Sequence, residues 1–290
     1  MFLDKRVVAV CFPRSGSHFL TNCLVSYFGD SLKYLEPYAN TSNFPKPRFG
    51  SHFIGARYLN FKYFCKRGAE GRADVTRAYS FDEANFIRFH DFSSFPKRSL
   101  YMSEDGVTIE RKYCLGNVTN QDNTCYLILI RHPIETIQSY YELLVHASGL
   151  PDSLESWNSF QEHALEYWKS FVDKWIINPN DHLVKNKLVV LYEDIINNTE
   201  MVLSRVVSCF DYKNLEQGRI RKIAKLRYVS TRRISDFKYF DAQSCINIQD
   251  QLYDAYLKPI GITPYVNFSN SVSSCRSRFV EKVISKTMSW

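Results

Sequence analysis

Three short runs of Val, Ile and Leu, each followed by a segment with helical periodicity, constrain the fold of this chain more than any other feature. The runs are Val7–Phe12, Tyr126–Ile130 and Leu188–Leu191. None of them alternates apolar with polar residues, which is typical of strands covered on both faces. The helical patterns that follow them span residues 17–28, 133 to about 145, and 199–210. Repeated strand–helix units predict an α/β fold of three layers, with a mainly parallel central sheet flanked by helices.

In sheets of this kind, ligands bind beyond the carboxyl ends of the strands. A fourth apolar run, Phe86–Phe89, adds another expected strand. The residues that directly follow the four runs are Pro13–Ser17, His90, Arg131 and Tyr192–Asp194. We therefore expect a serine-rich loop, a histidine and an arginine to share one edge of the sheet.

The junction Pro13–Ser17 between the first strand and its helix has two interpretations. A tight turn into a helix directs unpaired backbone N–H groups at one point, where the helix dipole favours an anion. Gly16 would let the chain approach that anion closely, Ser15 and Ser17 offer hydroxyls, and Arg14 supplies charge,. The alternative is a capped strand–helix turn with Ser17 near the N-cap position.

The stretch PRSGSHFL resembles the 5′-phosphosulfate loop of the sulfotransferases, commonly written PKSGTTWL, which binds 3′-phosphoadenosine 5′-phosphosulfate (PAPS). The resemblance implies that Arg14, Ser15, Gly16 and Ser17 bind the donor. His18 occupies a threonine position of the family's loop, from which it reaches the donor phosphate. Phe19 stands where the family has a tryptophan beside the adenine; it either stacks on the base or belongs to the core.

A second stretch, LILIRHPIETIQSYYELL, resembles the family's other main motif, in which an arginine and a serine eight residues later bind the donor's 3′-phosphate. Here these residues are Arg131 and Ser139. Tyr192 in VVLYEDI matches a tyrosine that approaches the adenine. RRISDFKYF resembles a shortened RKGxxGDWKxxF segment with Ile234 at the glycine, so that Arg232 and Arg233 would meet the 3′-phosphate.

The resemblance implies transfer of a sulfuryl group from PAPS to a hydroxyl or amine of a small-molecule or carbohydrate acceptor, with adenosine 3′,5′-bisphosphate (PAP) as product. Because the sulfuryl group carries less charge than a phosphoryl group, no metal is expected. Arg14 would stabilise charge on the departing phosphate. FIRFHDF resembles the family's KTHLP segment, which makes His90 the general base and puts Arg88 at the lysine; alternatively His90 is a strand-end histidine bonded to Asp91. Glu36, downstream of the first loop, is the rival base.

The length and composition of the chain are those of a globular protein. The chain has 290 residues, 45% of them hydrophobic, and we expect a single domain over residues 1–263 with a C-terminal extension over 264–290. Residues 31–123 would contribute acceptor-pocket insertions. No window reaches eighteen uncharged apolar residues and the eight cysteines form no CxxC pair, so we expect a cytoplasmic protein with reduced thiols and no membrane span.

The net charge of +7 is unevenly placed, with seven Lys or Arg and no acid between Gly218 and Ser235. This cluster indicates either a phosphate or another polyanion as partner, or a solvated helix face. No nucleic-acid-binding motif accompanies it, and the sequence leaves the oligomeric state open. Two alternative functions are a magnesium-independent nucleotide- or polyanion-binding module without catalysis and a nucleotide-dependent kinase, the latter disfavoured because the Walker lysine is missing.

Overall fold

A computed structural model of the chain describes residues 5–35, 84–90, 124–148, 150–177, 186–210, 215–225, 239 and 242–264. The chain divides into two compact units, Met1–Val229 and Ser230–Trp290. We describe each unit by itself. The expectation of one domain over residues 1–263, with acceptor-pocket insertions over 31–123 and an extension over 264–290, stays a prediction.

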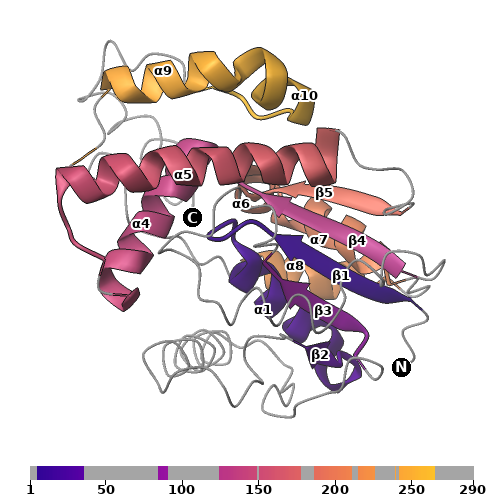
Figure 1. Cartoon of the computed structure of the whole chain (residues 1–290). Coiled ribbons are helices and arrows are strands. Elements are labelled where there is room, and N and C mark those ends of the chain that lie inside the picture. The colour runs from indigo at the N-terminus through magenta and orange to yellow at the C-terminus, as the bar shows by residue number, and fades with distance from the viewer. Residues whose placement is uncertain are drawn as a thin grey trace, which may run out of the picture. The chain divides into compact units, whose positions relative to one another are not determined.

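The first unit is built on a five-stranded sheet in the order β2-β3-β1-β4-β5 (Figure 1). Its strands are β1 (Arg6–Cys11), β2 (Tyr34–Leu35), β3 (Phe86–Phe89), β4 (Thr124–Ile130) and β5 (Lys187–Leu191). Every neighbouring pair is parallel. All four apolar runs that predicted strands form them, whereas β2 has two residues and is too short to leave a pattern.

The helices of this unit follow the strands in the predicted order. They are α1 (Ser17–Phe28), α4 (Pro133–Ser148), α5 (Leu154–Val172), α6 (Tyr192–Asn197), α7 (Thr199–Ser208) and α8 (Gln217–Lys225), with a 3₁₀ turn η1 (Gly29–Ser31) after α1 and a π turn η5 (Asp173–Ile177) after α5. The expected helix 17–28 is confirmed at both ends. The helices expected after β4 and β5 also form, but the short α6 separates β5 from α7.

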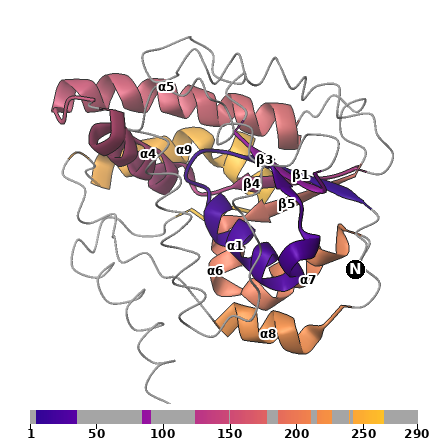
Figure 2. The same ribbon diagram turned by 90° about the horizontal axis from the view of Figure 1, so that it is seen from below.

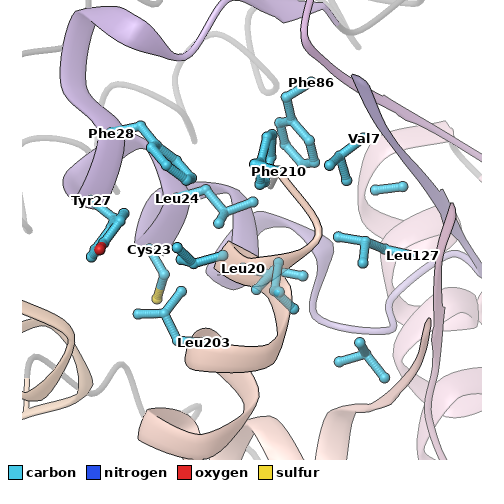
Figure 3. Packing of buried hydrophobic residues seen from close by; sticks show 14 of the residues in the cluster. Val7, Leu20, Cys23, Leu24, Tyr27, Phe28, Phe86, Leu127, Leu203 and Phe210 are labelled. Atoms are coloured by element: carbon cyan, nitrogen blue, oxygen red, sulfur yellow. The ribbon is translucent and has the colours of Figure 1, made fainter. Parts of the chain in front are cut away.

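Helices cover both faces of the sheet, as Figures 1 and 2 show from two directions. Alternate residues of β1, Val7, Ala9 and Cys11, belong to a buried cluster with side chains of α1, α7 and α8 (Figure 3). On the opposite face, the Phe12 ring lies 4.5 Å from the ring of Tyr167 in α5. The predicted three-layer α/β fold with a parallel sheet is therefore confirmed. Burial on both faces also explains why the strand sequences do not alternate.

The second unit contains α9 (Ala242–Leu252), a π turn η7 (Tyr253–Leu257) and α10 (Lys258–Ile260). Gly261 ends α10 in the left-handed region with φ 77°, a backbone conformation that suits glycine. Across the residues described in both units, we find no helix with the length and apolar character needed to cross a membrane.

Candidate functional site

The first loop, Pro13–Ser17, leaves the carboxyl end of β1 and turns at once into α1. The backbone N–H and the hydroxyl of Ser15 both donate to the carbonyl of Phe12, at 3.2 and 2.6 Å. Arg14 has φ 68° and Gly16 has φ 86°, so two residues of the loop lie in the left-handed region. For a non-glycine residue this conformation costs about 1–2 kcal/mol. The loop is thus a tight turn that its own hydrogen bonds hold closed.

The start of α1 has the features of an anion-binding helix terminus. Its N-cap residue is Gly16, and within the part of the chain that the structure describes no side chain caps it. The interpretation of a turn capped by Ser17 is therefore wrong, because Ser17 is already the first helical residue. The N–H groups at the start of a helix point away from its body, and the positive end of the helix dipole favours an anion there.

A buried arginine on β3 supports the first loop from below. Arg88 is 1% exposed, and its Nη1 donates to the hydroxyl of Ser17 at 3.0 Å. Its guanidinium also lies 6.0 Å from the ring centroid of Tyr34. Because Ser17 Oγ accepts from Arg88, its own hydrogen points elsewhere and can be donated to a ligand. Arg88 therefore adds positive charge directly beneath the loop.

The second predicted motif begins at the carboxyl end of β4. Arg131 Nε donates to Glu135 Oε2 at 2.7 Å, and its Nη2 is paired with the same oxygen. Trp168 of α5 donates its indole N–H to the Arg131 carbonyl at 3.1 Å, which fixes the end of the strand. Glu135 was not predicted, although an acid four residues after an arginine at a helix start is a recognisable pairing pattern.

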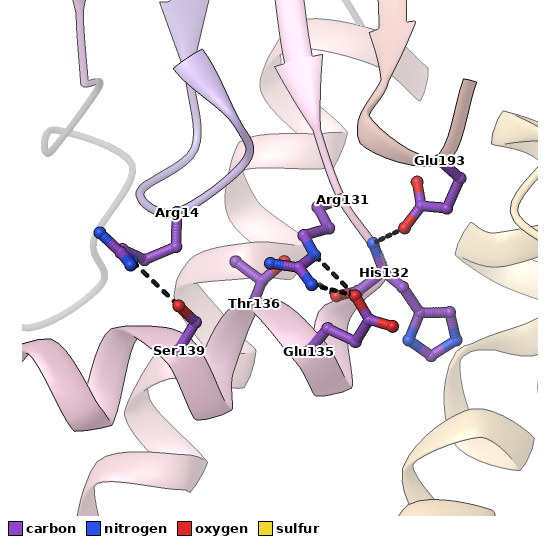
Figure 4. Close-up of polar contacts among 7 residues, drawn as sticks. All are labelled: Arg14, Arg131, His132, Glu135, Thr136, Ser139 and Glu193. Carbon is purple, nitrogen blue, oxygen red and sulfur yellow. Dashed lines mark hydrogen bonds and ion pairs between the residues drawn. The ribbon is translucent and has the colours of Figure 1, made fainter. Parts of the chain in front are cut away.

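The two predicted motifs meet in space (Figure 4). Arg14 Nε donates to Ser139 Oγ at 3.0 Å, although the residues are 125 positions apart in the sequence. Arg14 is exposed, and Ser139 lies on α4 nearly two turns after Pro133,. The expectation that the loop after β1 and the arginine–serine motif share one edge of the sheet is met by this contact.

Tyr192, the first residue of α6, lies between these two motifs. A Cβ atom built on Gly16 would come within 2.4 Å of Tyr192 Cδ2, so the ring packs directly on the loop backbone. The guanidinium carbon of Arg131 lies 4.2 Å from the centroid of the same ring, a cation–π distance. Burial raises the pKa of Tyr192, against the opposing effect of the Arg131 and Arg14 charges. The phenol therefore stays protonated at neutral pH.

Glu193 ties α6 to the end of β4. Its Oε1 accepts from the backbone N–H of His132 at 2.9 Å. Burial raises the pKa of Glu193 above its ordinary value, and the hydrogen bond from His132 and the Arg131 charge only partly offset this. The hydrogen bond from His132 thus holds Glu193, and with it the adjacent Tyr192, next to Arg131. Because Glu193 is buried, its ionised form lowers the free energy of unfolding.

His90 follows β3 and faces the end of β1. Its Nδ1 lies 2.8 Å from the Cys11 carbonyl oxygen, which can only accept, so Nδ1 carries a hydrogen, and in the neutral ring Nε2 is the acceptor nitrogen. Cys11 belongs to β1, which neighbours β3 in the sheet, where Val10 pairs with Phe89. The expected bond to Asp91 involves a residue outside those described. An imidazole oriented in this way is suited to accept a proton at Nε2.

The remaining predicted site residues are either partly buried on α1 or lie outside the described residues. His18 is half-buried on the first turn of α1. Phe19 is partly buried and packs against the hydrophobic cluster, which supports its interpretation as a core residue. Glu36, Arg232 and Arg233 are not among the described residues, and their roles stay predictions.

The part of the basic cluster that the structure describes lies on α8, away from the first loop. Arg219 Nη2 donates to the Ser26 carbonyl at 3.2 Å, about 14 Å along α1 from its first residue. Arg221 is exposed and pairs with Glu200 at 3.2 Å. The exposed Arg221 agrees with a solvated helix face, whereas Arg219 packs against α1.

Comparisons with known proteins give structural matches only. No protein-family model matches the chain, and no curated protein is a significant match. Among solved structures, 17 chains match. Retinol dehydratase with androsterone and inactive cofactor PAP is 14% identical, with 97% of this chain and 78% of that chain covered and a TM-score of 0.42. The structure of the same enzyme with retinol and PAP is 16% identical, with 98% of this chain and 79% of that chain covered and a TM-score of 0.42.

A third solved structure is the sulfotransferase domain of the Synechococcus PCC 7002 olefin synthase. It is 16% identical, with 73% of this chain and 74% of that chain covered and a TM-score of 0.39.

The contact between Gly16 and Tyr192 predicts a coupled pair of substitutions. Gly16→Ala should lower the free energy of unfolding by about 2–5 kcal/mol, because it adds left-handed strain to a clash with the ring. In a Tyr192→Ala background the clash is gone, and the same change should cost only about 1–2 kcal/mol. Urea denaturation of the four proteins measures both values. Equal costs in the two backgrounds would contradict the packing described.

The raised pKa of Glu193 predicts a pH-dependent effect of Glu193→Gln, which keeps an acceptor for the His132 N–H. When folding raises the pKa of a carboxyl, its contribution to the free energy of unfolding is complete below the pKa of the unfolded state. That contribution is lost as the pH rises through the pKa of the folded state. The stability of the glutamine variant relative to the parent should therefore increase from pH 4 towards pH 7. Denaturation curves at several pH values measure this difference, and a constant difference would show that the carboxyl is not perturbed.

Proposed function

We propose that this protein transfers a sulfuryl group from PAPS to a hydroxyl or amine of a small-molecule or carbohydrate acceptor. The observation that carries the proposal is the hydrogen bond between Arg14 and Ser139. It brings together two segments that separately resemble the 5′- and 3′-phosphate motifs of sulfotransferases. A nucleotide with phosphates at both ends of its ribose requires two anion sites at such close range.

The first loop suits the 5′-phosphosulfate end of the donor. The first-turn N–H groups of α1, the Ser17 hydroxyl and the exposed Arg14 guanidinium are donors for its oxygens. A side chain at position 16 would displace Tyr192, so glycine lets the loop backbone pack against this ring. Ser15 already donates its hydroxyl to Phe12 and would act by shaping the loop.

The Arg131 motif suits the 3′-phosphate. Ser139 offers a hydroxyl, and Arg131 a guanidinium that now faces the Glu135 carboxylate. A phosphate dianion carries more charge than the carboxylate and accepts a bidentate arginine pair. Arg232 and Arg233 would add charge at the same phosphate, as the resemblance implies. Tyr192 would contact the adenine, with His18 near the donor phosphate.

His90 is the proposed general base, and Glu36 is the rival. The Cys11 carbonyl holds the tautomer in which Nε2 accepts the acceptor's proton, and it also stabilises the imidazolium that forms,. As the acceptor oxygen or nitrogen bonds to sulfur, the bond from sulfur to the 5′-phosphate oxygen breaks, and PAP leaves with that electron pair. Arg14 stabilises the growing negative charge without giving up a proton, because arginine stays protonated.

Ligand preference tests the donor site without knowledge of the acceptor. PAP should stabilise the protein against heat more than AMP does, with an affinity at least about tenfold higher, because charge-assisted hydrogen bonds to the 3′-phosphate contribute about 1.5–3 kcal/mol. Arg131→Ala should remove this preference. Arg221→Ala, which removes an exposed arginine of α8 that pairs with Glu200 of α7, should keep it.

Equal thermal shifts with PAP and AMP in the parent protein would refute a 3′-phosphate site. A larger shift with ATP and magnesium than with PAP would favour the kinase alternative. Either result is obtained with the full chain.

The role of His90 is tested by turnover with PAPS labelled in its sulfuryl group and a panel of phenols, sterols, sugars and amines. His90→Ala should lower kcat about 10²–10⁴-fold and leave PAP affinity within a few-fold of the parent. His163 is a matched control, because its Nδ1 also lies 2.7 Å from a backbone carbonyl, that of Ser159. His163→Ala should keep full activity.

Glu36→Ala distinguishes the rival base in the same assay. Full activity of His90→Ala together with loss in Glu36→Ala would assign the base to Glu36. Tight PAP binding without turnover of any acceptor would favour the non-catalytic binding module.

A further inference from the structure

We propose that Tyr192 is a positioning residue that makes the two phosphate sites bind cooperatively. This inference rests on the proposed function, because it assigns a 5′-phosphate to the first loop and a 3′-phosphate to Arg131. Tyr192 would act through its ring contacts with protein groups on both sides, in addition to the contact with adenine that the sequence resemblance implies.

The first of these contacts is with the backbone of the first loop. The ring edge of Tyr192 fills the space that a side chain at Gly16 would occupy, with Cδ2 and Cε2 at 2.4 and 2.8 Å from the ideal Cβ position. Gly16 is the N-cap of α1, so its peptide orients the N–H groups offered to the 5′-phosphate. A displacement of this loop would press directly on the ring.

The second contact is with the arginine of the 3′-phosphate site. The Arg131 guanidinium lies 4.2 Å from the ring centroid, so the aromatic face helps to set its position. An aromatic ring is rigid and is moved as a unit by its two side-chain torsions. The same ring therefore cannot follow the first loop without changing its contact with Arg131.

The backbone of Tyr192 is itself fastened to the end of β4. The next residue, Glu193, accepts from the N–H of His132 at 2.9 Å, and His132 directly follows Arg131. Ile195, on the following turn of α6, is 1% exposed. These contacts hold α6 against the strand end, so the ring spans a short, fixed gap between the two anion sites.

The consequence is a binding free energy that is not additive. When the 5′-phosphate binds and shifts the first loop, the ring and the arginine shift with it, so that binding of one phosphate changes the site that the other phosphate meets. The gain in affinity from the 3′-phosphate should be about tenfold larger when the 5′-phosphate is present than when it is absent.

The coupling is obtained from the affinities of the full chain for four ligands: adenosine, AMP, adenosine 3′-monophosphate and PAP. Calorimetry measures the tight ligands, and displacement of labelled PAP measures the weak ones. The coupling factor is the affinity gain from the 3′-phosphate in the PAP/AMP pair divided by the gain in the 3′-monophosphate/adenosine pair. Any contact of Tyr192 with the adenine affects all four ligands and cancels. A purely structural role would lower all four affinities and leave the factor unchanged.

We expect a factor of about ten in the parent protein, a similar factor in Tyr192→Phe, which keeps the ring, and a factor near one in Tyr192→Leu. If circular dichroism shows that the leucine variant is unfolded, Tyr192→Met keeps the side-chain volume without an aromatic face and gives the same readout. A parent factor of one, or a factor that both aliphatic variants retain, would overturn the inference while PAP is still preferred over AMP. Loss of that preference in the parent would instead refute the proposed function.

Discussion

The parallel pairing of β1 with β3 on one side and β4 on the other is the constraint on which the site depends. The hydrogen bonds of these two ladders bring the carboxyl ends of three strands to the same edge. His90, the first loop and Arg131 leave the sheet from those three ends, and each is held by a neighbour. The Cys11 carbonyl bonds His90, and Ser139 bonds Arg14. The strand pairing thus brings these residues to the same edge of the sheet, and single side-chain contacts fix their orientation.

Three arginines approach the same edge; two of them donate to serine hydroxyls and the third pairs with a carboxylate. Arg88 is buried and donates to Ser17, Arg14 is exposed and donates to Ser139, and Arg131 pairs with Glu135 across the face of Tyr192. Like charges in one place repel, and an anion bound among them relieves that repulsion. This gathering of guanidinium groups is the physical basis on which we propose an anionic nucleotide for the site.

The first loop stores local strain that the surrounding structure must maintain. Both Arg14 and Gly16 lie in the left-handed region, and the hydrogen bonds of Ser15 to Phe12 close the turn. Tyr192 packs against the glycine from outside. Strain of this kind persists where the neighbouring contacts determine the conformation, and it is common where a backbone must present several N–H groups to one ligand.

The sequence by itself determined the strand–helix units, the limits of α1 and the identity of the residues at the strand ends, because burial and helical periodicity are local patterns. It did not reveal that the basic residues Arg219 and Arg221 contact Ser26 and Glu200. Nor did it show that Tyr192 lies on Gly16, or that the partner of His90 is a carbonyl of β1. Only the tertiary structure decided these contacts, because they join residues far apart in the chain whose distance is set by strand order and helix packing, which no local pattern records.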